Sequence, residues 1–265
     1  MECRGGACSG FSSSNNISPF DCILFDLDDT LYSGDTGIVG FVRQNIEEFL
    51  VKTCGVTAEK ACSLRSELFG SHGSSLTGLR ATGYDVHPDD YHSYVHGRLP
   101  YELIQPDPLL RDLLQSIPQT KIIFTNSDRE HARKVLTRLG LDGCFDGVIC
   151  FEALNPDVSA APILLKPSPL AFEAAIRLAG IDPRRTLFLD DSERNIAAGK
   201  ALGLRTALVG KPAKTQEADY LVGSVHDLHR TVPDVWRGAE GKKPPTRPGE
   251  EQKLRLSVAT APVEA

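Results

Sequence analysis

The sequence predicts an α/β fold: a doubly wound parallel sheet with a small helical cap inserted after its first strand. Short apolar runs of strand length alternate with helix-like stretches, which is typical of parallel strands joined by crossover helices. Between the first two apolar runs, however, lie four consecutive helix-like stretches. A crossover needs only one helix, so the additional helices predict a separate subdomain.

Five apolar runs predict the strands. The first, DCILFDL at 21–27, ends in carboxylates and is expected to be a buried strand that leads into a polar loop. The other four are Thr120–Thr125, Asp146–Phe151, Thr186–Leu189 and Arg205–Val209. In a parallel sheet the carboxyl ends of the strands lie at one edge, where ligands bind.

The helix-like stretches predict which residues cover the sheet and which form the cap, and composition predicts the disordered ends. Three stretches that end in glycine are expected to cover the sheet: Asp128–Gly140, Leu170–Gly180 and Glu193–Gly203. Four others form the cap: Ile38–Gly55, Thr57–Gly70, Ser74–Thr82 and Pro88–Arg98. The core is thus expected at 20–32 and 107–236, and the cap at 33–106. Residues 1–19 and 237–265 lack a periodic apolar face and are expected to be disordered.

Composition and charge exclude several classes of protein. The net charge of −6 and the lack of a basic cluster argue against a nucleic-acid partner. No apolar run approaches the roughly 18 residues that a membrane span requires, so no membrane segment is expected. The seven cysteines are odd in number and form no CxxC pair, which favours reduced thiols and a cytoplasmic location. Nothing in the sequence specifies an oligomeric state.

Carboxylates cluster directly after the first predicted strand, where Asp26, Asp28 and Asp29 occupy three of four successive positions. Like charges this close repel one another, and burying them at a strand end requires a compensating cation. A hard divalent ion with oxygen ligands meets this need, and Mg²⁺ is the usual ion beside phosphate. Because solvated turns also contain such clusters, this motif alone does not decide the function.

Three further polar elements follow later strands. Thr125-Asn126-Ser127 offers a hydroxyl group and backbone N–H groups to phosphate oxygens. Lys166 precedes a predicted helix and supplies one positive charge, and Asp190-Asp191 supplies a second pair of carboxylates. All of them lie at or beyond strand ends, so we expect them to converge on one crevice.

The order of these four motifs resembles that of the haloacid dehalogenase-like hydrolase superfamily, and together they span roughly 21–209. DLDDTLYS, TNSDREHA, FLDDSERN and the helical insert most resemble the pyrimidine 5′-nucleotidase-like branch, which includes plant and fungal nucleoside-monophosphate phosphatases. The resemblance implies a Rossmann-like core. It also implies that Asp26 attacks phosphorus, and that Asp28 protonates the leaving oxygen and then deprotonates the hydrolytic water.

The same resemblance implies the binding groups. Mg²⁺ would be held by Asp26, the carbonyl of Asp28 and Asp191, with Asp190 acting through water. Thr125, Asn126 and Lys166 would bind the transferring phosphoryl group. A true dehalogenase is disfavoured, because it has no use for an acid at Asp28.

The sequence leaves open the roles of several residues in the cap and of Asn195, which follows Asp190-Asp191. Arg80 either contacts the organic part of the substrate or is a solvated charge. The same two roles are open for Arg98, for which a contact with the substrate has less support. His87, His92 and His96 lack a convincing ligand set and are expected at the surface or in packing. Asn195 either supports the carboxylates before it or lies unused on an exposed turn.

The predicted activity is Mg²⁺-dependent hydrolysis of a phosphate monoester. The substrate is expected to be small, because a cap restricts access to the crevice. A nucleoside 5′-monophosphate is the favoured substrate, either a pyrimidine nucleotide or a purine nucleotide such as XMP or GMP. The alternatives are a sugar-phosphate or pyridoxal-phosphate phosphatase, a phosphomutase, and a non-catalytic regulatory protein that kept the fold.

Overall fold

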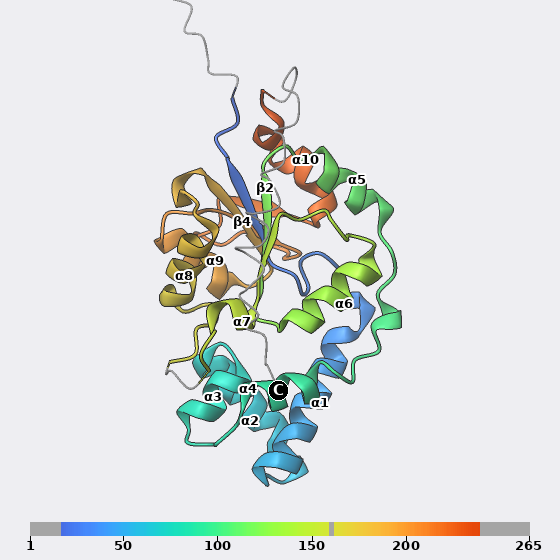
Figure 1. The fold of residues 1–265 in the computed structure, drawn as a ribbon, viewed down its shortest axis with the longest axis vertical. Coiled ribbons are helices and arrows are strands. Elements are labelled where there is room, and N and C mark those ends of the chain that lie inside the picture. The colour runs from blue at the N-terminus through green and yellow to red at the C-terminus, as the bar shows by residue number, and fades with distance from the viewer. Residues whose placement is uncertain (1–16, 159–161, 239–265) are drawn as a thin grey trace, which may run out of the picture.

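The computed structural model describes residues 17–158 and 162–238 of the chain. Its centre is a parallel sheet of six strands in the order β3-β2-β1-β4-β5-β6 (Figure 1). The strands are β1 Cys22–Phe25, β2 Thr120–Phe124, β3 Gly147–Ile149, β4 Thr186–Asp190, β5 Arg205–Val209 and β6 Tyr220–Val222. The predicted doubly wound sheet is confirmed, and β6 is an additional short edge strand that the sequence pattern did not reveal.

The first strand lies in the middle of the sheet, and its register brings the predicted motifs together. Phe25 pairs with Ile123 of β2 on one side and with Leu189 of β4 on the other. The residues that follow these three positions therefore emerge side by side at the carboxyl edge. This register accounts for the convergence of motifs that lie far apart in the sequence.

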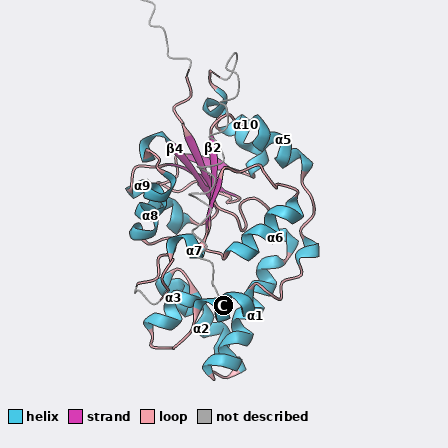
Figure 2. Cartoon of the chain, viewed as in Figure 1, coloured by secondary structure: helices cyan, strands magenta, loops and turns pink. Residues whose placement is uncertain are grey.

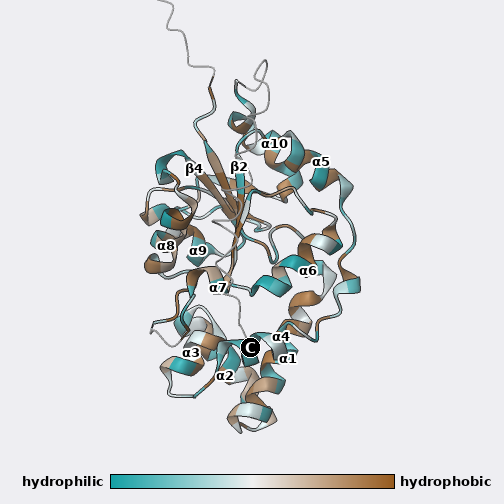
Figure 3. Cartoon of the chain, viewed as in Figure 1, coloured by the Kyte–Doolittle hydropathy of each residue, from teal (hydrophilic) through white to brown (hydrophobic). Residues whose placement is uncertain are grey.

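Alternating side chains of β1 build one hydrophobic layer on each face of the sheet. Ile23 and Phe25 belong to the layer covered by α5 Pro108–Ser116, α6 Arg129–Leu139 and α10 Leu228–Thr231. Cys22 and Leu24 belong to the layer covered by α7 Phe151–Leu154, α8 Pro169–Ala179 and α9 Glu193–Ala201 (Figure 2). Figure 3 shows the resulting apolar sheet, with hydrophilic residues on the helices that surround it. The described part of the chain also contains short 3-10 helices at Gly34–Thr36, Tyr101–Leu103, Pro183–Arg185, Val225–Asp227 and Pro233–Trp236.

The predicted cap consists of four helices: α1 Ile38–Cys54, α2 Ala58–His72, α3 Ser75–Ala81 and α4 Pro88–Val95. Its hydrophobic centre includes Phe49 and Leu79, and also Phe151, which belongs to the core. The cap and the core thus share one apolar cluster.

Hydrogen bonds and close packing also join the cap to the core. Arg194 of α9 donates hydrogen bonds to the carbonyls of Phe69 (3.1 Å) and Gly70 (2.9 Å) near the end of α2. Gly73, which follows α2 with φ +75°, packs so tightly that an added Cβ would lie 2.5 Å from Cδ of Pro167. Only glycine fits this approach, which brings the start of α3 next to the residue that follows Lys166.

The ends of the described chain lie together. The backbone N–H of Ser18, which is buried, donates to the carbonyl of Arg237 at 3.1 Å. The remaining residues of the segments predicted to be disordered, 1–16 and 239–265, lie outside the described residues. Among the helices of 17–158 and 162–238, none has the length and apolar character that crossing a membrane requires.

Candidate active site

Asp26 lies at the carboxyl end of the central strand and is only 7% exposed. Its Oδ1 accepts a hydrogen bond from Nζ of Lys166 at 2.7 Å, and its Oδ2 accepts one from the hydroxyl of Thr30 at 3.0 Å. The backbone N–H of Asp26 donates to the carbonyl of Leu189 in β4, which fixes the residue to the sheet. Asp26 is therefore rigidly positioned at the centre of the strand-end edge.

Lys166 is the buried cation of the site, with 2% of its surface exposed. Its ammonium donates to Asp26, to Oδ2 of Asp190 at 2.8 Å and to the carbonyl of Phe124 at 2.7 Å. Burial alone would lower the pKa of Lys166, but the charges of Asp190 and Asp26 outweigh it and raise the pKa above its usual range. The ammonium is thus held charged, with a partner for each of its three hydrogens.

Asn126 and Thr125 lie beside this lysine. The side chain of Asn126 donates to the carbonyl of Lys166 at 2.9 Å and accepts from its backbone N–H at 2.8 Å. Both polar groups of Asn126, which was predicted to bind phosphate, therefore hold the backbone of Lys166. Thr125 is 1% exposed, and its hydroxyl oxygen accepts from the N–H of Ser127 at 3.0 Å.

Three carboxylates meet at this edge. One oxygen from each of Asp26, Asp190 and Asp191 lies within 4.8 Å of the others. Burial raises the pKa of Asp26 well above its usual range, and repulsion from Asp190 and Asp28 adds to the effect, although Lys166 opposes it. Burial and Asp190 likewise raise the pKa of Asp191. The negative charge here exceeds what Lys166 compensates, and oxygen donors at this spacing fit a divalent metal ion.

Asp190 and Asp191 have different surroundings. Asp190 is 0% exposed and accepts hydrogen bonds from Lys166, from the N–H of Ser192 at 2.8 Å and from Nδ2 of Asn195 at 3.0 and 3.1 Å. Asp191 has one recorded partner, Nζ of Lys211 at 3.2 Å. Asn195 therefore supports Asp190, which settles the alternative that the sequence left open.

Asp28 lies apart from the carboxylate triad and is held by three side chains that the sequence analysis did not assign to it. Its Oδ1 accepts from the hydroxyl of Tyr32 at 2.6 Å and lies 2.7 Å from Nε2 of His131, while its Oδ2 accepts from the hydroxyl of Ser127 at 2.7 Å. Burial alone would raise the pKa of Asp28, but the charge of His131 and the three hydrogen bonds hold it well below its usual range. His131 faces the strand-end edge from the first turn of α6, three residues after its N-cap Asp128, and this spacing was the available sequence signal.

The charged residues of the cap lie in different environments. Arg80 is half-buried in α3, and no ion pair or hydrogen bond of its side chain is recorded with any described residue. Arg98 is exposed and pairs with Glu48 at 2.8 Å, not with Asp89 or Asp90. His92 and His96 are packed in α4 and at its end, whereas His87 is exposed and caps that helix.

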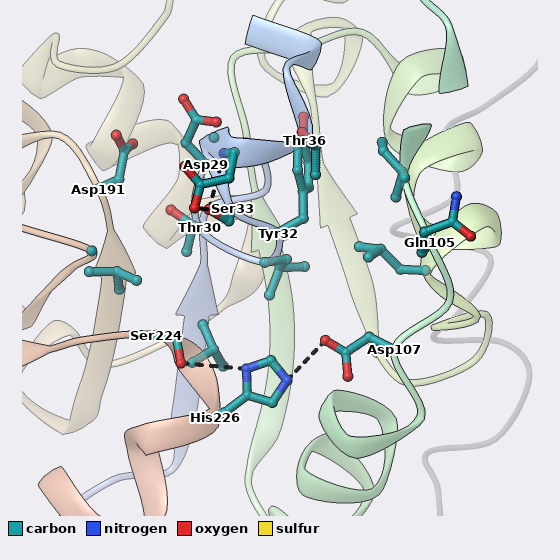
Figure 4. Close-up of a pocket in the computed structure, with 18 of the residues that line it drawn as sticks. Asp29, Thr30, Tyr32, Ser33, Thr36, Gln105, Asp107, Asp191, Ser224 and His226 are labelled. Atoms are coloured by element: carbon teal, nitrogen blue, oxygen red, sulfur yellow. Dashed lines mark hydrogen bonds and ion pairs between the residues drawn. The ribbon is translucent and has the colours of Figure 1, made fainter. Parts of the chain in front are cut away.

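A cavity of about 680 Å³ opens beside Asp191 (Figure 4). Its walls are formed by Leu139, Asp191 and the segments 29–36, 103–107, 209–211 and 223–226. Burial, together with the charges of Asp191 and Asp28, raises the pKa of Asp29 in this wall to about 6. Opposite, Nε2 of His226 lies 2.9 Å from a carboxylate oxygen of Asp107. The lining of the cavity contains four aspartates and one lysine, Lys211, together with apolar residues such as Leu31 and Ile104.

Comparisons with known proteins agree with this geometry. Phosphate metabolism protein 8 of Saccharomyces cerevisiae is 27% identical over 190 residues, which are 68% of this chain and 59% of the yeast protein. The chain thus matches about three fifths of the length of that relative. Pyrophosphatase PpaX of Halalkalibacterium halodurans is 25% identical over 218 residues, 78% of this chain and 94% of that protein.

A solved structure shows the same fold. The HAD-hydrolase YfnB of Bacillus subtilis, bound to magnesium, has a TM-score of 0.52 at 18% identity, covering 80% of this chain and 97% of YfnB. The family model described as haloacid dehalogenase-like hydrolase matches residues 20–203, well over half of the chain. The chain therefore belongs to the haloacid dehalogenase-like hydrolases.

Proposed function

We propose that the protein is a Mg²⁺-dependent phosphatase that hydrolyses a small phosphate monoester through an aspartyl-phosphate intermediate on Asp26. The observation that carries the proposal is the contact of one buried ammonium, that of Lys166, with both Asp26 and Asp190. A carboxylate that attacks an anionic ester must overcome charge repulsion, and a fixed buried cation reduces it.

The proposed reaction has two steps. In the first, a carboxylate oxygen of Asp26 forms a bond to phosphorus, the ester P–O bond breaks, and Asp28 gives a proton to the leaving oxygen. The pKa of Asp28 is low in the unliganded protein, so Asp28 takes up this proton when the anionic substrate binds, because a nearby negative charge raises the pKa of a carboxyl group. In the second, water attacks the phosphorus of the acyl phosphate while Asp28 takes a proton from it. The bond between phosphorus and Asp26 then breaks, which releases phosphate and restores the carboxylate. The hydroxyl of Thr125 is assigned to the phosphoryl oxygens, and so is the ammonium of Lys166, which exchanges one of its three present partners for the substrate.

The acidic residues would hold Mg²⁺ as the family resemblance implies: Asp26, the carbonyl of Asp28 and Asp191 directly, and Asp190 through water. Two features support this division. The carboxylate of Asp190 already accepts from Lys166, Ser192 and Asn195, whereas that of Asp191 has Lys211 as its one hydrogen-bond partner among the described residues. When bound, the ion would neutralise charge on the transferring phosphoryl group.

We propose a nucleoside 5′-monophosphate as the substrate, with Arg80 contacting its base or sugar. The resemblance of DLDDTLYS, TNSDREHA and FLDDSERN to nucleoside-monophosphate phosphatases supports this choice. The position of α3 adds to it, because Gly73 just before this helix touches Pro167, next to Lys166. The names of the two relatives, a phosphate metabolism protein and a pyrophosphatase, support a reaction at phosphorus for this protein.

Release of inorganic phosphate across a substrate panel tests the proposal. The panel contains pyrimidine and purine nucleoside 5′-monophosphates, sugar phosphates, pyridoxal phosphate and pyrophosphate. We expect the highest kcat/KM with a nucleotide. Isomerisation of a sugar phosphate that requires a bisphosphate activator would indicate a phosphomutase. Neither phosphate release nor isomerisation with any compound would contradict the proposal and favour the non-catalytic alternative.

A further inference from the structure

A buried histidine contacts the proposed acid–base group. His131 is 1% exposed, and its Nε2 lies 2.7 Å from Oδ1 of Asp28. A carboxylate oxygen accepts hydrogen bonds, so Nε2 carries the hydrogen in this contact. With Tyr32 on the same oxygen and Ser127 on the other, donors engage both oxygens of Asp28 and fix the plane of its carboxylate.

His131 is itself held by residues from both sides of the boundary between cap and core. Its Nδ1 lies 2.8 Å from the hydroxyl of Tyr101, in the segment that returns from the cap. Its backbone N–H donates to Oδ1 of Asp128 at 2.9 Å. The ring of His96, which follows the last cap helix, packs against the ring of His131 with centroids 4.4 Å apart.

We propose that His131 is a positioning residue for Asp28, an inference that rests on the proposed function. Proton transfer requires the acid–base oxygen within about 2.6–3.2 Å of the atom it serves. Asp28 lies in the loop after β1, and its side chain is 34% exposed, so packing alone does not fix the orientation of the carboxylate. Of its three donors, His131 is the one that lies in a helix, and its other ring nitrogen, Nδ1, is held by the hydroxyl of Tyr101.

The test compares three variants of the full chain with the wild-type protein. His131→Leu removes the donor to Asp28. His131→Gln retains an amide N–H at a position close to that of Nε2 and is the conservative rescue. His92→Leu is the matched control, because His92 is also a buried histidine of this cluster, stacks on His96 and makes no recorded contact with Asp28.

The first readout is alcohol release in a single turnover, measured for an alkyl ester (a nucleoside 5′-monophosphate) and for p-nitrophenyl phosphate. An alkoxide needs protonation to leave, whereas p-nitrophenolate leaves readily without it. His131→Leu should therefore slow alkyl ester cleavage by about 10- to 100-fold, with a much smaller loss on the aryl ester and little change in KM. His131→Gln should restore most of the rate, and His92→Leu should resemble the wild-type protein.

A crystal structure of each variant gives a second readout that does not depend on activity. We expect the carboxylate of Asp28 to turn away from its present orientation in His131→Leu and to keep it in His131→Gln and His92→Leu. An unchanged carboxylate in His131→Leu would overturn the inference, as would equal rate losses in His131→Leu and His92→Leu. If the wild-type protein hydrolyses no ester, the proposed function fails, and the crystal structures still decide whether His131 positions Asp28.

Discussion

Nζ of Lys166 lies 2.7 Å from Oδ1 of Asp26, and the lysine side chain is 1% exposed. The same ammonium lies 2.8 Å from Oδ2 of Asp190, so one buried cation joins the ends of the two adjacent strands β1 and β4. In a poorly solvated site such a contact is strong, and removal of one partner leaves an uncompensated buried charge.

Replacement of this lysine should damage both catalysis and stability. Lys166→Met leaves Asp26 and Asp190 without their cation, so we expect kcat to fall by about 100-fold or more. We also expect the free energy of unfolding to fall by about 3 kcal/mol, as for other broken buried pairs. Steady-state kinetics and urea unfolding measure the two effects. Lys200→Met is the control, because Lys200 pairs with Asp219 at 2.7 Å and is 40% exposed; similar effects in both variants would contradict a special role for Lys166.

Magnesium should be required for activity and should also stabilise the folded protein. Chelation should abolish phosphate release, and Ca²⁺ should support it poorly, because its looser coordination misplaces the nucleophile. Raised pKa values of Asp26 and Asp191 mean that protons compete with the metal, so apparent Mg²⁺ affinity should weaken as pH falls. A thermal-shift titration with Mg²⁺ measures this without substrate. An equal shift in Asp191→Asn would argue against the proposed ligands.

Arg80→Ala tests the proposed contact between the cap and the substrate. A guanidinium that contacts the base or sugar contributes roughly 1.5–3 kcal/mol, so its loss should raise KM for the best nucleotide by about 10- to 100-fold. Hydrolysis of p-nitrophenyl phosphate, which lacks those groups, should be almost unchanged. Equal losses on both substrates would mean that Arg80 holds the cap or binds phosphate. No loss on either would identify a solvated charge.

The buried His92 predicts that acid destabilises the fold. Burial, with a smaller contribution from His96, lowers the pKa of His92 from 6.5 to about 3. The folded state therefore keeps a neutral imidazole while the unfolded chain binds a proton below pH 6.5, so stability falls as pH falls from 6.5 toward 3. Between pH 7 and pH 5 the contribution is about 2 kcal/mol.

Urea unfolding at these two pH values measures the effect, with His92→Leu as the control. The wild-type protein should lose about 2 kcal/mol more than the variant, since leucine does not titrate. The same pH dependence in both proteins would show that His92 is not the group responsible.

The sequence predicted the fold better than the immediate surroundings of the site. Apolar runs followed by carboxylates or threonine located the central strands, because a buried parallel strand and a polar strand end have a clear pattern. Tyr220–Val222 was missed because its apolar run is only three residues long and is bounded by Asp219 and Gly223, whereas the apolar run around the equally short β3 continues to Phe151. Tertiary packing decides such short edge strands.

Within the site, convergence could be predicted and individual contacts could not. Parallel topology brings Asp26, Thr125 and Asp190 to one edge, whereas Lys166 reaches that edge from the turn before α8. That Asn126 holds the backbone of Lys166, or that His131 and Tyr32 meet on one oxygen of Asp28, depends on side-chain orientations that spacing does not specify. Such contacts become visible only once the cap and the sheet are packed together.

The central claim is that Asp26 forms a covalent phosphoenzyme. The most direct measurement uses a substrate labelled in its phosphoryl group. The reaction of the wild-type protein is quenched with acid during turnover, and peptide mapping then locates the label. Asp26→Asn is treated in the same way. We expect the label on the peptide that contains Asp26, and neither label nor turnover in Asp26→Asn, because an amide is a very poor nucleophile. Sustained phosphate release by Asp26→Asn, or label on another residue, would contradict the account.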